Sequence, residues 1–195
     1  MNKRGFTLVE MLVVIAVLSI VGLLVLTIFT RTLRGSNKAQ IVLTIKQNGL
    51  AVLETIDKTI RNSDSVVCIS ENPDNTIVVH KDEDNLYTRY RFVVDSTGVA
   101  NGLILQDNPQ KGASEVDGQF ISRICAPLDS MSGAHILTDT NPLTGVSLIS
   151  GSFTRSVGIK NLITIQFVLA PGANAPPAVA GQIDPITFQT TIERR

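Results

Sequence analysis

The sequence predicts an α+β protein in which a long N-terminal helix packs on an antiparallel β-sheet. An apolar run without a charged residue at residues 11–29 is followed by an apolar stripe at helical spacing over residues 42–60. From residue 66 onward, short runs of β-branched and aromatic residues alternate with turn residues. A single amphipathic helix cannot bury its apolar face alone, and a sheet with one apolar face supplies the second layer.

The apolar run is long enough to cross a membrane as a helix. From Phe6 to Thr30 the only charged residue is Glu10, and a span needs about 20 apolar residues. No small-residue cleavage site follows the run, as it would in a secretory signal peptide. Basic residues before a span keep that end in the cytoplasm. Lys3 and Arg4 therefore predict a single-pass inner-membrane protein whose C-terminal domain lies outside the cytoplasm.

Glu10 is unusual because a carboxylate inside a membrane span costs a few kcal/mol or more and usually has a partner. Glu10 also lies within about two helical turns of Arg4. Two interpretations are therefore open: Glu10 pairs with a cation inside the membrane, or it sits near the lipid headgroups as part of a simple anchor.

Lys3-Arg4-Gly5-Phe6-Thr7-Leu8-Val9-Glu10 resembles the class III leader junction of type IV pilins and type II secretion pseudopilins. In that family a prepilin peptidase cuts after the glycine and N-methylates the new terminus, and the glutamate pairs with the terminal amine of a neighbouring subunit. The resemblance implies that Gly5 is the cleavage site, Phe6 the methylated residue and Glu10 the assembly carboxylate.

The implied pairing has a physical reason. Before cleavage Glu10 is a lone charge in lipid, and after cleavage the Phe6 amine of another subunit can neutralise it. A buried ion pair is tolerated where a lone buried ion costs several kcal/mol. The resemblance thus implies four partners: the prepilin peptidase, other pilin or pseudopilin subunits, an inner-membrane assembly platform, and membrane lipid before assembly.

Residues 31–63 predict that the helix continues outward as an amphipathic segment. Its apolar stripe comprises Val42, Ile45, Gly49, Val52, Leu53, Ile56 and Ile60. Gly35-Ser36-Asn37 is a candidate break, and residues 62–65 should end the helix. Gly22 either gives the helix local flexibility, as in similar helices of the pilin family, or lets a neighbouring helix approach closely.

The remainder, residues 64–195, predicts an extracytoplasmic antiparallel β domain. The expected strands cover residues 66–69, 76–79, 86–94, 103–105, 120–126, 163–169 and 186–192. Turns are expected at residues 71–75, 95–98 and 150–152. Residues 108–119, 129–145 and 170–185 resist a regular interpretation and either connect strands or carry recognition. The closing residues 186–195 resemble the end of larger J-type (or W-type) minor subunits.

Cys68 and Cys125 both follow the span, on the predicted outer side where disulfides persist. A bridge between them would close a long loop and stabilise the fold by about 4 kcal/mol in the chain-entropy model. The alternative is two buried free thiols, because free cysteine is often a small core residue.

No set of residues is arranged for catalysis or for a cofactor, so we expect neither an enzyme nor a metal site. His80 and His135 lack metal-ligand spacing, which predicts ordinary strand or surface histidines. Ser150-Gly151-Ser152 lacks the pattern of a nucleophile elbow. The acidic run at residues 81–85 lacks the glycine and distal glutamate of an EF-hand loop, so a solvated hairpin tip is favoured over a calcium site.

Binding of nucleic acid is not indicated. The formal net charge is zero, whereas a nucleic-acid binder carries a basic stripe. Arg89 and Arg91 alternate on what should be the outer face of one strand, where they either serve solubility or touch DNA or an acidic partner. The predicted function is a structural minor pilin or pseudopilin subunit acting in assembly initiation or at the filament tip. The alternative is a tip adhesin or DNA-binding module of the same topology.

Overall fold

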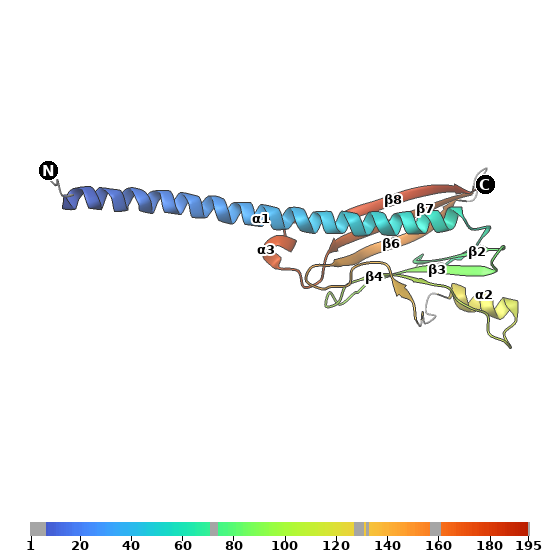
Figure 1. The fold of residues 1–195 in the computed structure, drawn as a ribbon. Coiled ribbons are helices and arrows are strands. Elements are labelled where there is room, and N and C mark those ends of the chain that lie inside the picture. Colours follow the sequence, from blue (N-terminus) through green and yellow to red (C-terminus); the bar gives the residue numbers. More distant parts are fainter. Residues whose placement is uncertain (1–6, 71–73, 127–130, 132, 157–160, 195) are drawn as a thin grey trace. The chain divides into compact units, whose positions relative to one another are not determined.

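The computed structural model describes residues 7–70, 74–126, 131, 133–156 and 161–194. The chain divides into two compact units, Met1–Gln40 and Ile41–Arg195. The helix α1 (Leu8–Arg61) belongs to both, and the remaining helices and strands lie in the second unit (Figure 1). The structure confirms the predicted α+β class, with a long N-terminal helix and antiparallel sheets.

In the first unit every described side chain is exposed. Hydroxyl groups in this part of α1 turn back onto the helix: Ser19 Oγ donates to the Ile15 carbonyl at 2.8 Å, and Thr27 Oγ1 donates to the Leu23 carbonyl at 2.8 Å. A polar group in lipid must find its hydrogen bonds within the protein. These serine and threonine side chains therefore suit an apolar environment.

The predicted break at Gly35-Ser36-Asn37 is wrong, because α1 runs through these residues and through Gly22 without interruption. Each weak helix former costs at most about 1 kcal/mol relative to alanine. Good helix formers on either side offset that cost. The proposed local flexibility at Gly22 stays a prediction.

In the second unit, α1 buries the predicted stripe. Ile45, Gly49, Val52, Ile56 and Ile60 are buried, and Val42 and Leu53 pack against them at the margin. The helix ends at Arg61, where Ser63 Oγ donates to the Ile60 carbonyl at 2.8 Å. The expected stop at residues 62–65 is confirmed.

Two antiparallel sheets form the body of this unit. The first is five-stranded, in the order β1-β2-β3-β4-β5, and the second is three-stranded, in the order β6-β7-β8. The strands are β1 (Ser65–Ile69), β2 (Thr76–Lys81), β3 (Leu86–Val93), β4 (Leu103–Asp107), β5 (His135–Ile136), β6 (Val146–Ser156), β7 (Asn161–Pro171) and β8 (Ile186–Arg194). Two short helices, α2 (Asp117–Cys125) and α3 (Pro177–Ala180), complete the unit.

One core joins α1 to both sheets. Phe92 of β3 stacks on Phe153 of β6 with ring centroids 4.4 Å apart, and Phe167 of β7 stacks on Phe188 of β8 at 5.3 Å. The strands predicted over residues 163–169 and 186–192 are therefore confirmed as β7 and β8, with alternate residues facing this core.

Two predictions of secondary structure in this unit are wrong. The strand expected over residues 120–126 is not formed: residues 120–125 belong to helix α2, in which Phe120 and Ile124 share one face that packs on Val78. Residues 150–152 lie inside strand β6, not in a turn. Gly151 permits this strand to cross the five-stranded sheet, since a Cβ there would come 2.5 Å from the Phe92 ring.

The irregular stretches contain more order than predicted. β5 lies within residues 129–145, and α3 lies within residues 170–185. Buried Asn101 ties the loops around it together: Nδ2 donates to the Thr140 carbonyl at 3.0 Å, and Oδ1 accepts from the Ala173 amide at 2.7 Å. The turn at residues 95–98 is confirmed, with Gly98 at a φ of 69°. Within the turn expected at residues 71–75, residues 71–73 lie outside the described part.

Candidate processing and assembly site

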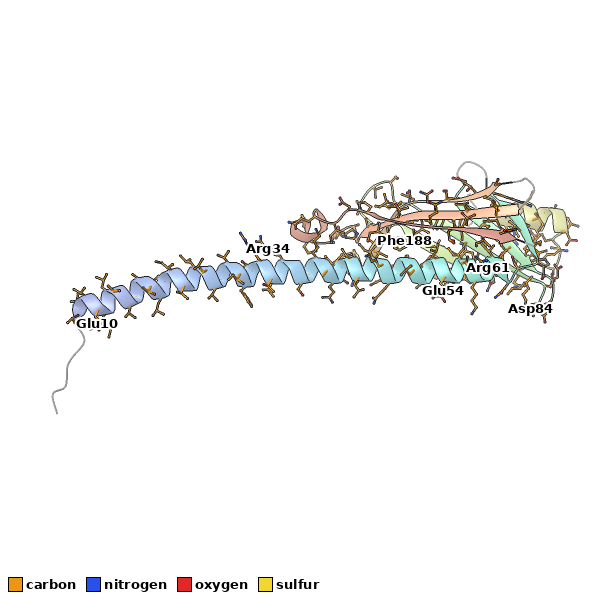
Figure 2. The ribbon with its side chains drawn as sticks, turned by 90° about the horizontal axis from the view of Figure 1, so that it is seen from above. Glu10, Arg34, Glu54, Arg61, Asp84 and Phe188 are labelled. Carbon is orange, nitrogen blue, oxygen red and sulfur yellow. A yellow bond between two sulfur atoms is a disulfide. The ribbon has the colours of Figure 1, made fainter. Side chains whose placement is uncertain are left out.

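Glu10 lies in the first turn of α1 (Figure 2). Thr7 precedes the helix, and its Oγ1 accepts a hydrogen bond from the Glu10 amide at 3.3 Å. Thr7-Leu8-Val9-Glu10 has the spacing of a capping box, in which a threonine side chain satisfies an amide that the helix leaves unpaired. Sequence reasoning missed this cap, although the Thr-x-x-Glu pattern was visible.

The helix N-terminus also favours the negative charge of Glu10. Unpaired amides there carry partial positive charge, and an acidic side chain in the first turn is stabilised by it. The Glu10 side chain is exposed, so its carboxylate is accessible to a group on another molecule. The predicted cleavage site Gly5 and the predicted methylated residue Phe6 lie outside the described residues.

An apolar surface without another charge follows Glu10. The large apolar side chains from Met11 to Phe29 are roughly half or more exposed, and the next charged residue is Arg31. Among the described residues α1 is the helix long and apolar enough to cross a membrane. Such a surface is far larger than the apolar patches that soluble monomers expose. It is consistent with a single-pass membrane anchor.

The structure joins Cys68 of β1 to Cys125 at the end of α2 in a disulfide, with the Cα atoms 6.1 Å apart. It links the edge of the five-stranded sheet to the helix that covers that sheet's outer face. Its position is that of a structural crosslink.

Arg89 and Arg91 are not on an exposed face, and the prediction that they lie there is wrong. Arg89 is 1% exposed and Arg91 is 6% exposed. Arg89 binds Asp107 of β4 through both Nε (2.9 Å) and Nη2 (2.6 Å). A bidentate pair of this kind is among the strongest charge-assisted hydrogen bonds.

The two arginines also hold the C-terminal end of α2. Nη1 of Arg89 donates to the Ile124 carbonyl at 3.2 Å, and Nη2 of Arg91 donates to the Ala126 carbonyl at 2.8 Å. Carbonyl groups at a helix C-terminus lack helical partners and favour cations. Their burial removes the charged surface on which contact with DNA was considered.

The remaining candidate residues lie where the sequence predicted. His80 is in β2 and His135 is in β5. The acidic run forms the tip of the β2–β3 hairpin, where Lys81 Nζ lies 2.6 Å from Asp84 Oδ2 and 3.1 Å from Glu83 Oε2. These contacts raise the pKa of Lys81, chiefly through the hydrogen bond with Asp84. Lys81 thus partly neutralises the negative charge of Glu83 and Asp84, which would otherwise attract a calcium ion.

Comparison with known proteins bears on the N-terminus alone. Residues 1–26 match the family model of the prokaryotic N-terminal methylation motif. The comparisons with curated proteins and with solved structures gave no match. The match covers Gly5, Phe6 and Glu10 together with most of the apolar run. The chain therefore carries a prepilin leader of the type IV pilin kind, continued by an apolar helix, as expected of a processed pilin-like or pseudopilin-like subunit.

Proposed function

We propose that the chain is a minor pilin or pseudopilin, a structural subunit of a type IV pilus-like filament. A prepilin peptidase would cut after Gly5 and methylate Phe6, with the N-terminus in the cytoplasm and residues 64–195 outside. The subunit would then leave the inner membrane through an assembly platform and join the filament through α1. We place it at assembly initiation or at the tip, as a J-type (or W-type) minor subunit.

One observation carries this proposal: Glu10 is the single charge between residues 6 and 30, the exposed apolar part of a helix that begins with a methylation motif. A lone carboxylate in lipid is unfavourable. A cation that pairs with Glu10 during assembly would remove that cost. The amine created at Phe6 of a neighbouring subunit is such a cation. The pair would fix the register between subunits more than it adds stability.

The substitution Glu10→Gln tests the role of the carboxylate. Glutamine keeps the size and removes the charge, so we expect normal membrane insertion and normal cleavage. Incorporation into filaments should fall at least about tenfold, because losing the ion pair with the Phe6 amine should cost roughly 1.4 kcal/mol or more. Glu54→Gln is the matched control, because Glu54 is an exposed glutamate of the same helix (Figure 2). Equal incorporation of the Glu10→Gln and Glu54→Gln chains would refute the proposal.

We also propose that the chain has no catalytic activity. Among the described residues, no group of three or more His, Cys, Asp or Glu side chains is placed to hold a metal ion. Turnover by the purified full chain on a broad substrate panel would overturn this part of the proposal. The adhesin or DNA-binding alternative gains no support from Arg89 and Arg91, because both are committed to internal contacts.

A further inference from the structure

The two sheets have four outer strands, and three of them have features that disfavour pairing with another chain. β1 is short and carries an irregularity between Val66 and Cys68. β5 is two residues long. β6 carries an irregularity between Leu148 and Ser150. Short strands and bulges are the usual means by which proteins prevent edge-to-edge association.

β6 is in addition tied to the other sheet along its outer side. The Leu148 amide donates to the Gly102 carbonyl at 3.0 Å, and the Phe153 amide donates to the Asp74 carbonyl at 2.8 Å. These bonds use the backbone groups that an incoming strand would need. β6 therefore cannot accept a partner over its length.

β8 differs from the other three. It is nine residues long, pairs with β7 in continuous register and contains neither proline nor a bulge. Between Ile186 and Ile192, no hydrogen bond joins its backbone to any described residue outside β7. In an antiparallel pair every second residue turns its amide and carbonyl away from the neighbour. Between Ile186 and Ile192, β8 thus presents outward donors and acceptors that no described residue pairs with.

Between Ile186 and Ile192, the side chains of β8 do not include the residue types that prevent pairing with another strand. Thr187, Gln189 and Thr191 are exposed and uncharged, and Phe188 and Ile192 are buried on the opposite face. Natural edge strands commonly carry lysine, proline or an inward-pointing charge to prevent pairing. From Ile186 to Ile192 β8 has none of these residues.

We propose that the outer edge of β8 docks an extended strand of a different polypeptide chain, which adds to the three-stranded sheet. A row of alternating amides and carbonyls at strand spacing is matched by another strand backbone, the mode of recognition called β-augmentation. The partner strand carries apolar side chains at alternate positions, beside Phe188 and Ile192. Its other face carries uncharged polar residues, beside Thr187, Gln189 and Thr191.

A second copy of this chain fits the edge poorly, an argument that rests on the proposed membrane anchor. Residues 41–61 of α1 and β8 run in the same direction (Figure 1). An antiparallel pair of β8 strands would place the two chain entries at Ile41 at opposite ends of the joined sheet, although both must reach one membrane. A parallel pair about a two-fold axis would place the Phe188 face of one copy beside the Gln189 face of the other.

The first test measures whether the edge accepts a strand. The full chain in detergent micelles is mixed with a synthetic peptide of residues 186–192, which has no anchor and alternates as the partner should. We expect hydrogen exchange at alternate β8 amides to slow by about tenfold at millimolar peptide, because pairing adds to local protection. The same peptide N-methylated at every residue is the control. No slowing at any β8 amide, or equal slowing by the methylated peptide, overturns the proposal.

Two neighbouring proline substitutions test the edge from the side of the protein. The backbone amides of Gln189 and Thr190 point to opposite sides of the strand, because hydrogen bonding alternates along it. One of the two therefore faces β7, and the other faces outward. The proline variant that loses an outward amide keeps the thermal transition of the wild type and loses protection by the peptide. The variant that loses a β7 bond unfolds at lower temperature. If the proline variant that keeps the wild-type thermal transition is still protected by the peptide as the wild type is, the proposal fails.

A cysteine at the centre of the strand separates a different partner from a second copy. Thr190→Cys supplies an additional thiol, because Cys68 and Cys125 are already joined. In oxidised native membranes we expect no disulfide-linked homodimer, while a maleimide reagent still labels the thiol. A homodimer as the main product would refute the choice of partner, even if the peptide test succeeds. Because neither peptide nor proline test involves cleavage at Gly5, their failure is distinguishable from failure of the proposed function.

Discussion

Gly49 of α1 lies directly against the ring of Phe188 of β8, so that a Cβ on Gly49 would come 2.2 Å from Phe188 Cζ. The Phe188 ring cannot move away freely, because it is 7% exposed and stacks on Phe167. The absence of a side chain at residue 49 therefore sets how closely the helix approaches the three-stranded sheet.

Gly49→Ala should destabilise the fold although alanine is the better helix former. The helix gains about 1 kcal/mol, whereas overpacking a core costs about 1–3 kcal/mol. We expect a net loss of about 1 kcal/mol in the free energy of unfolding, measured by denaturant titration. In a Phe188→Leu background the same change should lose its penalty. Gly35→Ala is the control, since nothing lies within 4 Å of its added Cβ; equal effects at Gly35 and Gly49 would contradict the assignment.

Arg89→Met should be among the most destabilising single substitutions in the second unit. It leaves Asp107, whose side chain is 14% exposed, without its bidentate partner, and breaking a buried ion pair costs about 3–5 kcal/mol. Arg61→Met removes an ion pair with Asp57 in which the two side chains are 52% and 27% exposed, and it should destabilise the fold far less, because solvent screens such a pair. Thermal unfolding of the two variants compares them. A loss at Arg89 no greater than at Arg61 would show that the buried pair is not stabilising.

Much of this fold was predictable because its signals are local. The stripe from Ile45 to Ile60 repeats at helical spacing, and β7 and β8 alternate regularly, so periodicity identified both. The leader residues Gly5, Phe6 and Glu10 form one short motif. Thr7 also belongs to a local pattern, the capping box, and could have been identified as the helix cap.

The errors arose where the deciding partner is distant in sequence. Alternation along the strand predicts an exposed Arg89. Its burial is stabilised by hydrogen bonds with Asp107 and with the Ile124 carbonyl, and neither residue is near Arg89 in the sequence. The sequence predicts that Gly151 is a turn residue. In the structure it lies within a strand, and glycine is required there because the Phe92 ring occupies the space that a side chain would need. Phe120 and Ile124 form too short an apolar run to distinguish a helix from a strand.

Removal of the disulfide should weaken the fold without releasing α2 completely. Cys68 and Cys125 are 57 residues apart, and a loop of that length corresponds to about 4 kcal/mol in the chain-entropy model. The double variant Cys68→Ser with Cys125→Ser should therefore unfold at lower denaturant concentration. Arg89 and Arg91 still hold the α2 carbonyls, so exchange of the α2 amides should stay slower than in an unfolded segment. Free exchange of α2 would contradict the role of the arginines.

The turn after β3 should loosen in acid. The pKa of Asp95 is lowered from 3.8 to about 2, chiefly by the Thr97 hydroxyl and the Ala100 amide, which bind the carboxylate. A lowered pKa stabilises the turn fully above the ordinary value, and the contribution is lost as the pH falls through about 2. NMR of the Val99 and Ala100 amides should show this transition, and Asp95→Asn should abolish it. A midpoint near 3.8 would show that these hydrogen bonds do not form.

Mass spectrometry of the N-terminal peptide tests the central claim most directly. The chain is expressed with and without a prepilin peptidase, and a Gly5→Leu variant serves as the uncleavable control. The account predicts that peptidase yields a chain beginning at N-methylated Phe6, and that the leader is retained without the peptidase and in the variant. An N-terminus that is unchanged by the peptidase, or that begins elsewhere than Phe6, would contradict it.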